Sequence, residues 1–189
     1  MKKGRLLFFA ALSCLMLTPI VLAGFSPYLA FRDIDYIIAG FAGIVCLSLL
    51  VLQPVLATKD LPMHPRRMRI LHRWIGAAIA IGVVIHVGGL YITSPPDAID
   101  AFLFRAPTWF STFGVLAMWL TLAALILAIT RKRNPKRWKI MHRACATAVA
   151  VLTIFHALLI EGAMETVSKS LVCCAIALSL AWPLIRKRA

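Results

Sequence analysis

The chain has 189 residues, of which 61% are hydrophobic and 15% are charged, and its mean hydropathy is +0.88. These values exclude a soluble globular domain, a disordered segment and a small disulfide-bonded secreted module. The formal net charge of +14 invites a nucleic-acid interpretation, but the apolar stretches are as long as a bilayer core is thick. We therefore expect an all-α integral membrane protein with no nucleic-acid partner, since helices satisfy their backbone hydrogen bonds within lipid.

The apolar stretches predict one bundle of six transmembrane helices that occupies residues 1–189 as a single domain. A basic N-terminus (Lys2, Lys3 and Arg5) precedes the first stretch, which ends at Ala23, so a secretory signal cleaved after Ala23 is an alternative for this segment. We favour a retained span because the apolar run is long for a signal, and cleavage would leave five spans. The expected spans are residues 6–23, 34–57, 70–91, 109–130, 140–161 and 167–185.

The charged residues indicate the orientation of these spans. With the N-terminus in the cytoplasm, all but three of the 21 Lys and Arg residues fall on the cytoplasmic side, the exceptions being Arg32, Arg105 and Lys169. Of the seven acidic residues, only Asp60 falls inside. This is the positive-inside distribution. It predicts a multi-pass protein of the bacterial inner (plasma) membrane with both ends in the cytoplasm.

Two further features concern the membrane surface. The segment from Asp97 to Pro107 carries spaced apolar residues and is expected to form a short amphipathic helix on the outer surface. Three tryptophans lie near predicted interfaces, where amphipathic rings are common, and we expect them to act as anchors and nothing more. They are Trp109, Trp138 and Trp182.

An internal repeat places four of the five histidines. Residues 65–73 match residues 135–143 in type at nearly every position, at an offset of 70. Each copy contains a histidine, and a second histidine follows 14 residues later, which gives His72 with His86 and His142 with His156. The fifth histidine, His64, has Asn134 as its repeat counterpart.

The spacing of the histidines predicts two levels in the membrane. Fourteen residues of α-helix separate two side chains by about 21 Å and return them to within about 40° of the same face. The third and fifth spans are both odd-numbered, so they run parallel. His72 is therefore expected to face His142 near the cytoplasmic side, and His86 to face His156 near the outer side.

Facing imidazoles at two levels favour haem over other ligands. Ionisable residues inside hydrocarbon are costly and mark functional sites, and a haem held between two helices takes one neutral imidazole on each side. A zinc site needs three or four clustered ligands, and no Cys, Asp or Glu is placed to complete one. Arg73 and Arg143 adjoin the inner pair, where they could bind haem propionates, although the positive-inside rule explains them equally well.

The pattern His72-Arg73-Trp74-Ile75-Gly76…His86, with His142-Arg143…His156, resembles the ferric reductase-like transmembrane domain family. That family also includes the membrane parts of NADPH oxidases and the haem subunit serving the periplasmic methionine-sulfoxide reductase. The resemblance covers the whole chain. It implies two stacked b-type haems, whose irons His72 and His142 ligate at the inner level and His86 and His156 at the outer level.

The resemblance also implies a direction of electron transfer, from a cytosolic flavin or nicotinamide donor to an outer acceptor. Many members carry a C-terminal flavin and nicotinamide domain, whereas this chain stops at Ala189. We therefore expect FMN or FAD either to bind at the cytoplasmic side or to be supplied by a partner such as a cytosolic flavin reductase. The basic loops 59–69 and 131–139 could dock such a donor, or anionic lipid head groups.

The leading hypothesis is thus a membrane haem b subunit, the transmembrane electron-transfer component of an oxidoreductase. Its outer acceptor would be ferric iron or a periplasmic reductase partner. One alternative is a di-haem cytochrome b linked to quinone or ascorbate. An alternative of another class is a small transporter or channel whose histidines bind metal or relay protons.

Overall fold

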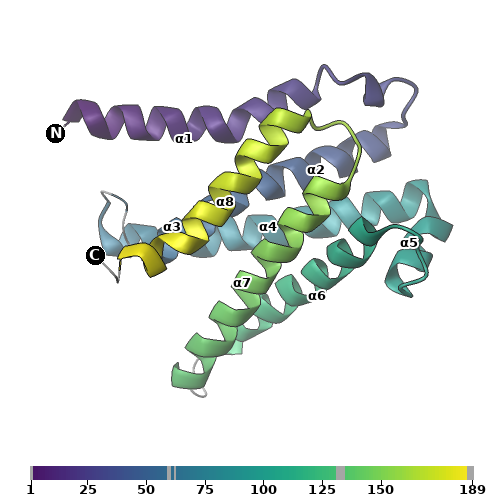
Figure 1. Ribbon diagram of the computed structural model, residues 1–189. Helices are drawn as coiled ribbons and strands as arrows, with labels where there is room; N and C mark the ends of the chain where they lie inside the picture. The colour runs from purple at the N-terminus through teal and green to yellow at the C-terminus, as the bar shows by residue number, and fades with distance from the viewer. Residues whose placement is uncertain (1, 59–60, 62, 131–134, 187–189) are drawn as a thin grey trace.

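The computed structural model describes residues 2–58, 61, 63–130 and 135–186. Within these ranges all regular structure is helical (Figure 1). The elements are α1 (Lys2–Ala23), η1 (Pro27–Leu29), α2 (Ile34–Leu50), α3 (Leu52–Thr58), α4 (Pro65–Thr93), α5 (Pro95–Phe102), α6 (Trp109–Thr130), α7 (Pro135–Leu159) and α8 (Thr166–Arg186).

Five helical segments in the described ranges are long and apolar enough to cross a membrane: α1, α2 together with α3, α4, α6 and α7. The apolar part of α8, Thr166–Trp182, is shorter. Large apolar side chains such as Leu6, Ile81 and Ile129 are more than 60% exposed on the outside of these helices. Exposed apolar surface of this extent is expected where lipid replaces water.

The second expected span, residues 34–57, is divided between α2 and α3. The Val51 amide donates a hydrogen bond to the Ser48 carbonyl, three residues earlier, at 3.3 Å. The backbone between the two helices therefore forms a turn tighter than that of an α-helix. The cause is Pro54, because a proline inside a helix has no N–H for the carbonyl four residues earlier and its ring crowds that carbonyl. By contrast, α6 runs without a break from residue 109 to residue 130, as expected.

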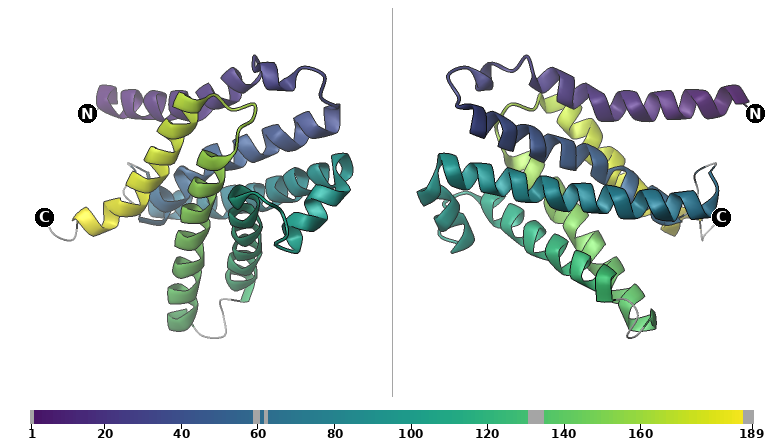
Figure 2. Two further views of the ribbon diagram at one scale, coloured as in Figure 1. Left: turned by 45° about the vertical axis from the view of Figure 1, so that its right-hand side comes forward. Right: turned by 180° about the vertical axis from the view of Figure 1, so that it is seen from behind.

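Two helix pairs form the body of the bundle. Helix α2 packs along α4, and α6 packs along α7 (Figure 2). Glycines bring α2 and α4 close together, since an added Cβ at Gly82 would overlap the Cys46 thiol and one at Gly89 would meet the Ala39 Cβ at 2.7 Å. Helix α8 completes the core, where its Val172 and Ile176 are fully buried. These glycines therefore serve helix packing.

Helices α4 and α7 begin in the same way, as the repeat predicts. Each has a proline at its first position, Pro65 or Pro135, where the missing N–H costs no helical hydrogen bond. The histidine outside the pairs, His64, caps α4, because its Nδ1 accepts a hydrogen bond from the Arg66 amide at 3.2 Å. Its repeat counterpart Asn134 lies outside the described residues.

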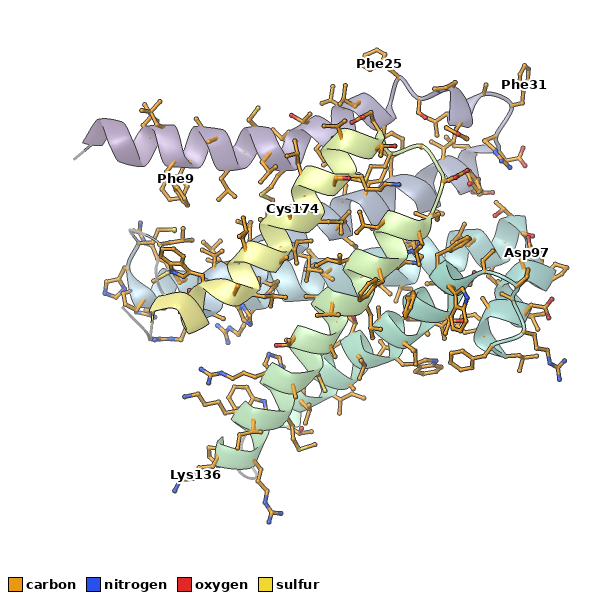
Figure 3. All side chains as sticks on the ribbon, in the orientation of Figure 1. Phe9, Phe25, Phe31, Asp97, Lys136 and Cys174 are labelled. Atoms are coloured by element: carbon orange, nitrogen blue, oxygen red, sulfur yellow. The ribbon has the colours of Figure 1, made fainter. Side chains whose placement is uncertain are left out.

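The two ends of the bundle differ in charge. Asp97 on α5 and Lys136 at the start of α7 lie at opposite ends (Figure 3). Helix α5 covers residues 97–102 of the segment 97–107 that was expected to be helical, and residues 103–107 lie beyond its end. Phe25 and Phe31, in the connection between α1 and α2, are 83% and 105% exposed and project outward (Figure 3). Exposed aromatic rings are typical of a membrane interface.

Glu165 caps helix α8, and this contact predicts a pH dependence. Its carboxylate accepts hydrogen bonds from the Ser168 and Val167 amides, both at 2.7 Å, and these bonds hold the pKa of Glu165 below its usual range. A depressed carboxyl pKa stabilises the fold above the unfolded-state value and ceases to do so as the pH falls through the folded-state value. We expect Glu165→Gln to lower the thermal midpoint at pH 7 and the deficit to shrink at acidic pH, measured by unfolding in detergent from pH 7 to pH 3. A deficit that stays constant over this range would contradict the capping role.

Candidate functional site

The four repeated histidines form two facing pairs. The ring centroids of His72 on α4 and His142 on α7 are 6.3 Å apart, with an angle of 73° between the ring planes. The centroids of His86 and His156 are also 6.3 Å apart, with an angle of 78°. The pairs are those that two parallel helices predict. Along each helix the levels lie about 21 Å apart.

Main-chain carbonyls hold the outer pair. The Nδ1 atom of His86 lies 2.7 Å from the carbonyl oxygen of Ala39 on α2, and Nδ1 of His156 lies 2.8 Å from that of Phe110 on α6. A carbonyl can only accept, so Nδ1 carries the proton in each ring. In a neutral imidazole this leaves the Nε2 lone pair free to bind a metal, and such a second hydrogen bond is usual for metal-ligating histidines.

Two glycines lie directly against the outer imidazoles. A Cβ at Gly43 on α2 would stand 2.9 Å from Nδ1 of His86, and a Cβ at Gly114 on α6 would stand 2.8 Å from Nδ1 of His156. Carbon atoms do not approach a ring nitrogen so closely without displacing it. The rings therefore occupy space that only glycine leaves.

The inner pair has a different surrounding. Nδ1 of His142 lies 3.2 Å from the carbonyl oxygen of Ala124, and the indole of Trp138 stacks on the imidazole at a centroid distance of 5.5 Å and an angle of 18°. Nδ1 of His72 is buried without a hydrogen-bond partner among the described residues. The Gln53 side chain donates instead to the main-chain carbonyl of His72 at 3.2 Å.

The separation of each pair fits one metal ion between two imidazoles. A metal about 2.0–2.1 Å from each nitrogen, with each ring centroid about 1.1 Å further back, separates the centroids by about 6.3 Å. No group of three or more His, Cys, Asp or Glu side chains placed to hold a metal occurs in the described part of the chain. A cofactor that needs only two axial protein ligands suits this donor set.

The remaining predicted residues take less specific positions. The side chains of Arg73 and Arg143 are exposed next to the inner pair. Trp109 and Trp182 are 73% and 51% exposed, and their role as anchors stays a prediction. The prediction that Trp138 acts only as an anchor is wrong, because Trp138 stacks on His142. In the basic loops, Lys59 and residues 131–134 lie outside the described residues.

Sequence reasoning missed the carbonyls and glycines that surround the outer rings. Ala39 with Gly43, and Phe110 with Gly114, recur at an offset of 71, one more than the histidines. That recurrence was the signal available in the sequence. Main-chain oxygens carry no sequence signal at all.

A buried lysine binds the end of the helix that carries His156. Lys169 in the first turn of α8 is only 6% exposed, and its Nζ donates to the carbonyl of Ile160 at 2.8 Å. Ile160 directly follows α7, and its amide donates to the carbonyl of His156. The ammonium thus satisfies a carbonyl at the C-terminal end of the helix that carries His156.

Comparison with protein-family models gives a match over more than half of the chain. The model described as ferric reductase like transmembrane component matches residues 38–153. The matched region includes three of the four paired histidines and ends three residues before His156. Comparisons with curated proteins and with solved structures gave no match.

Proposed function

The chain belongs to the ferric reductase-like transmembrane family, and from this membership we propose that it carries single electrons across a membrane through two b-type haems. The family and the five apolar helices make it an integral multi-pass membrane protein and a membrane oxidoreductase component. Beyond family membership, we propose the cofactor, its ligands and the direction of electron transfer. We propose a bundle of six spans, with α8 as the sixth and both ends in the cytoplasm of a bacterium.

The observation that carries the proposal is the equal 6.3 Å separation of both imidazole pairs. A bound haem supplies an iron that gains and loses one electron. His72 and His142 would ligate the inner iron, and His86 and His156 the outer iron. The carbonyls of Ala39 and Phe110 keep the outer ligands in the tautomer that presents Nε2, and this hydrogen bonding raises the basicity of the ligand.

The proposed path runs from the cytoplasmic side outward. Exposed cations such as Lys136 and Arg137 at the start of α7 offer a surface for a flavin phosphate or an acidic reductase. Arg73 and Arg143, exposed at the inner level, would pair with haem propionates. FMN or FAD, bound there or on a partner, would be the donor, and ferric iron or a periplasmic reductase the acceptor.

One observation favours a second candidate, a quinone-linked di-haem cytochrome. An apolar cavity of about 280 Å³ lies between α1, α3 and α4, and its lining includes Phe9, Leu56, Leu71 and Ile75. Leu71 and Ile75 belong to α4, the helix that carries His72, so a membrane-soluble donor in this cavity would lie against the helix that holds one of the inner ligands. Reduction of the purified protein by a quinol, but not by reduced flavin, would favour this candidate.

The test of the proposal is an absorption spectrum. The protein purified from membranes is expected to show the reduced-minus-oxidised bands of low-spin haem b after dithionite, at about two haems per chain. A folded but colourless preparation would contradict the proposal and favour a transporter or channel. Loss of one haem during purification is checked by adding hemin and repeating the titration.

The proposed orientation predicts the outcome of a reporter assay. Because cations gather on the cytoplasmic side, alkaline phosphatase fused after Arg133 or Arg188 should be inactive and a fusion after Asp97 active. Green fluorescent protein at the same positions should give the reverse pattern. An active phosphatase after Arg133 would invert the proposed electron path.

A further inference from the structure

We propose that Gly43 and Gly114 are positioning residues of the outer haem, because each leaves the space in which an imidazole reaches a main-chain carbonyl. The inference rests on the proposed function, since it concerns the ligands of one of the two haems. Neither glycine would touch the iron. Each would act through the histidine beside it.

The arrangement at His86 shows how this works. Gly43 follows Ala39 by four residues, so the two lie one turn apart on the same face of α2. The carbonyl of Ala39 accepts the Nδ1–H of His86 at 2.7 Å. A side chain at position 43 would stand over this carbonyl, and its Cβ would come within 2.9 Å of the same Nδ1 atom. Because Gly43 has no side chain, the Ala39 carbonyl remains accessible to the imidazole of His86 on α4.

The same arrangement occurs a second time, in α6. Gly114 follows Phe110 by four residues, and the Phe110 carbonyl accepts the Nδ1–H of His156 at 2.8 Å. A Cβ at Gly114 would lie 2.8 Å from that Nδ1 atom. Helices α2 and α6 thus each place a main-chain carbonyl and, four residues later, a glycine against one of the two facing imidazoles.

At the inner level, alanines stand at the positions that correspond to the two glycines, and the imidazoles have longer hydrogen bonds or none. Ala124 accepts from His142, and the residue four positions later is Ala128; here the distance is longer, at 3.2 Å. Gln53 lies 71 residues before Ala124 and is followed four positions later by Ala57. Nδ1 of His72, the ring on that side, has no hydrogen-bond partner in the described part of the structure. Short hydrogen bonds to the imidazole thus accompany the glycines.

Gly43 and Gly114 differ from other glycines of the bundle in what an added Cβ would contact. An added Cβ at Gly40 in α2 or at Gly88 in α4 would meet no atom within 4 Å. At Gly82 it would meet the Cys46 thiol, which belongs to helix packing and not to a histidine. Gly40 and Gly88 therefore serve as controls for an added methyl group that contacts nothing, and Gly82 serves as a control for disturbed helix packing.

The test compares Gly43→Ala and Gly114→Ala with Gly40→Ala and Gly88→Ala in the purified haem protein. The added methyl group should push the imidazole off its carbonyl, make the ligand less basic, and raise the midpoint potential of one of two redox steps. Haem at that level should be retained about 10–100-fold less tightly, as for other partners of metal ligands. The electron paramagnetic resonance signal of the same centre should change, whereas both controls should keep the wild-type spectrum and potentials.

Identification of the affected centre uses the histidine variants. Gly43→Ala should change the centre that His86→Ala removes and leave the centre that His72→Ala removes. Should Gly43→Ala fail to fold, Gly114→Ala tests the same inference on the other helix, and gel filtration in detergent reports folding. Gly82→Ala is expected to lower thermal stability without a selective shift in potential.

The outcomes separate the two proposals. A wild-type protein that binds two haems, with Gly43→Ala and Gly114→Ala matching the controls, overturns the positioning role and leaves the proposed function standing. Equal shifts at both centres also overturn it, because they indicate general loosening. A wild-type protein that binds no haem overturns the proposed function and this inference with it.

Discussion

Replacing either His86 or His156 by alanine is expected to remove the same haem, at the outer level, and to leave the inner haem in place. The two rings face each other at 6.3 Å, whereas about 21 Å of helix separates them from the inner level. One porphyrin therefore cannot take an axial ligand from each level. Each variant should lose about half of the haem absorbance and one of two steps in a redox titration.

Double variants test which histidines share a haem. His86→Ala with His156→Ala should add little to either single change, because both act on one site and their effects are not additive. His72→Ala with His156→Ala should abolish haem binding, because one ligand is lost at each level. His64→Ala is the control, since His64 caps α4 and faces neither pair. If His72 and His156 behaved as partners, the pairing and the parallel orientation of α4 and α7 would both be wrong.

Replacing Lys169 by methionine is expected to destabilise the fold, because it removes a buried hydrogen bond between α8 and the end of α7. Lys169 is 6% exposed, and its ammonium is bonded to the Ile160 carbonyl at 2.8 Å. Methionine keeps the length of the side chain but leaves that carbonyl without this donor. The free energy of unfolding should fall by about 1.5–3 kcal/mol, the usual worth of a hydrogen bond to a charged group.

Ser170→Ala is the matched control on the same helix. Its hydroxyl bonds to the Thr166 carbonyl at an exposed position, so its removal should change stability by no more than about 0.5 kcal/mol. Unfolding by a denaturing detergent, followed by circular dichroism, measures both. Equal stabilities for the two variants would show that the buried ammonium contributes nothing to the join between α7 and α8.

The length of the apolar runs was sufficient to predict most helices, since runs that match the thickness of a bilayer have few alternatives. The end of α6 at Thr130 and the start of α8 near Thr166 agree with the expected spans within a residue. The break after α2 was not predicted, although Pro54 is its visible cause. A proline within a membrane helix bends or breaks it according to its neighbours, which the linear pattern does not contain.

The candidate site was predictable only in part. The repeated spacing of the histidines predicted which rings face one another, because helix geometry fixes depth and face together. The partners of those rings were not predictable, since the oxygens of Ala39 and Phe110 belong to the main chain. Trp138 was assigned to the interface by its position alone, yet its ring lies on His142. A single residue outside a repeated pattern, such as Trp138, gives its depth in the membrane but not the direction in which its side chain points.

Lys169 has a consequence for the electric field along α7. His156 lies in the last turn of this helix, where aligned peptide dipoles place about half a negative charge. An electron arriving at the proposed outer haem would meet this charge and be repelled. The ammonium of Lys169, bonded to the Ile160 carbonyl just beyond the helix, would oppose this charge and so would lower the electrostatic energy of the proposed outer centre when it is reduced. Lys169 would therefore make outward transfer less uphill, and a lysine that joins two helices would also adjust the driving force between the two sides of the membrane.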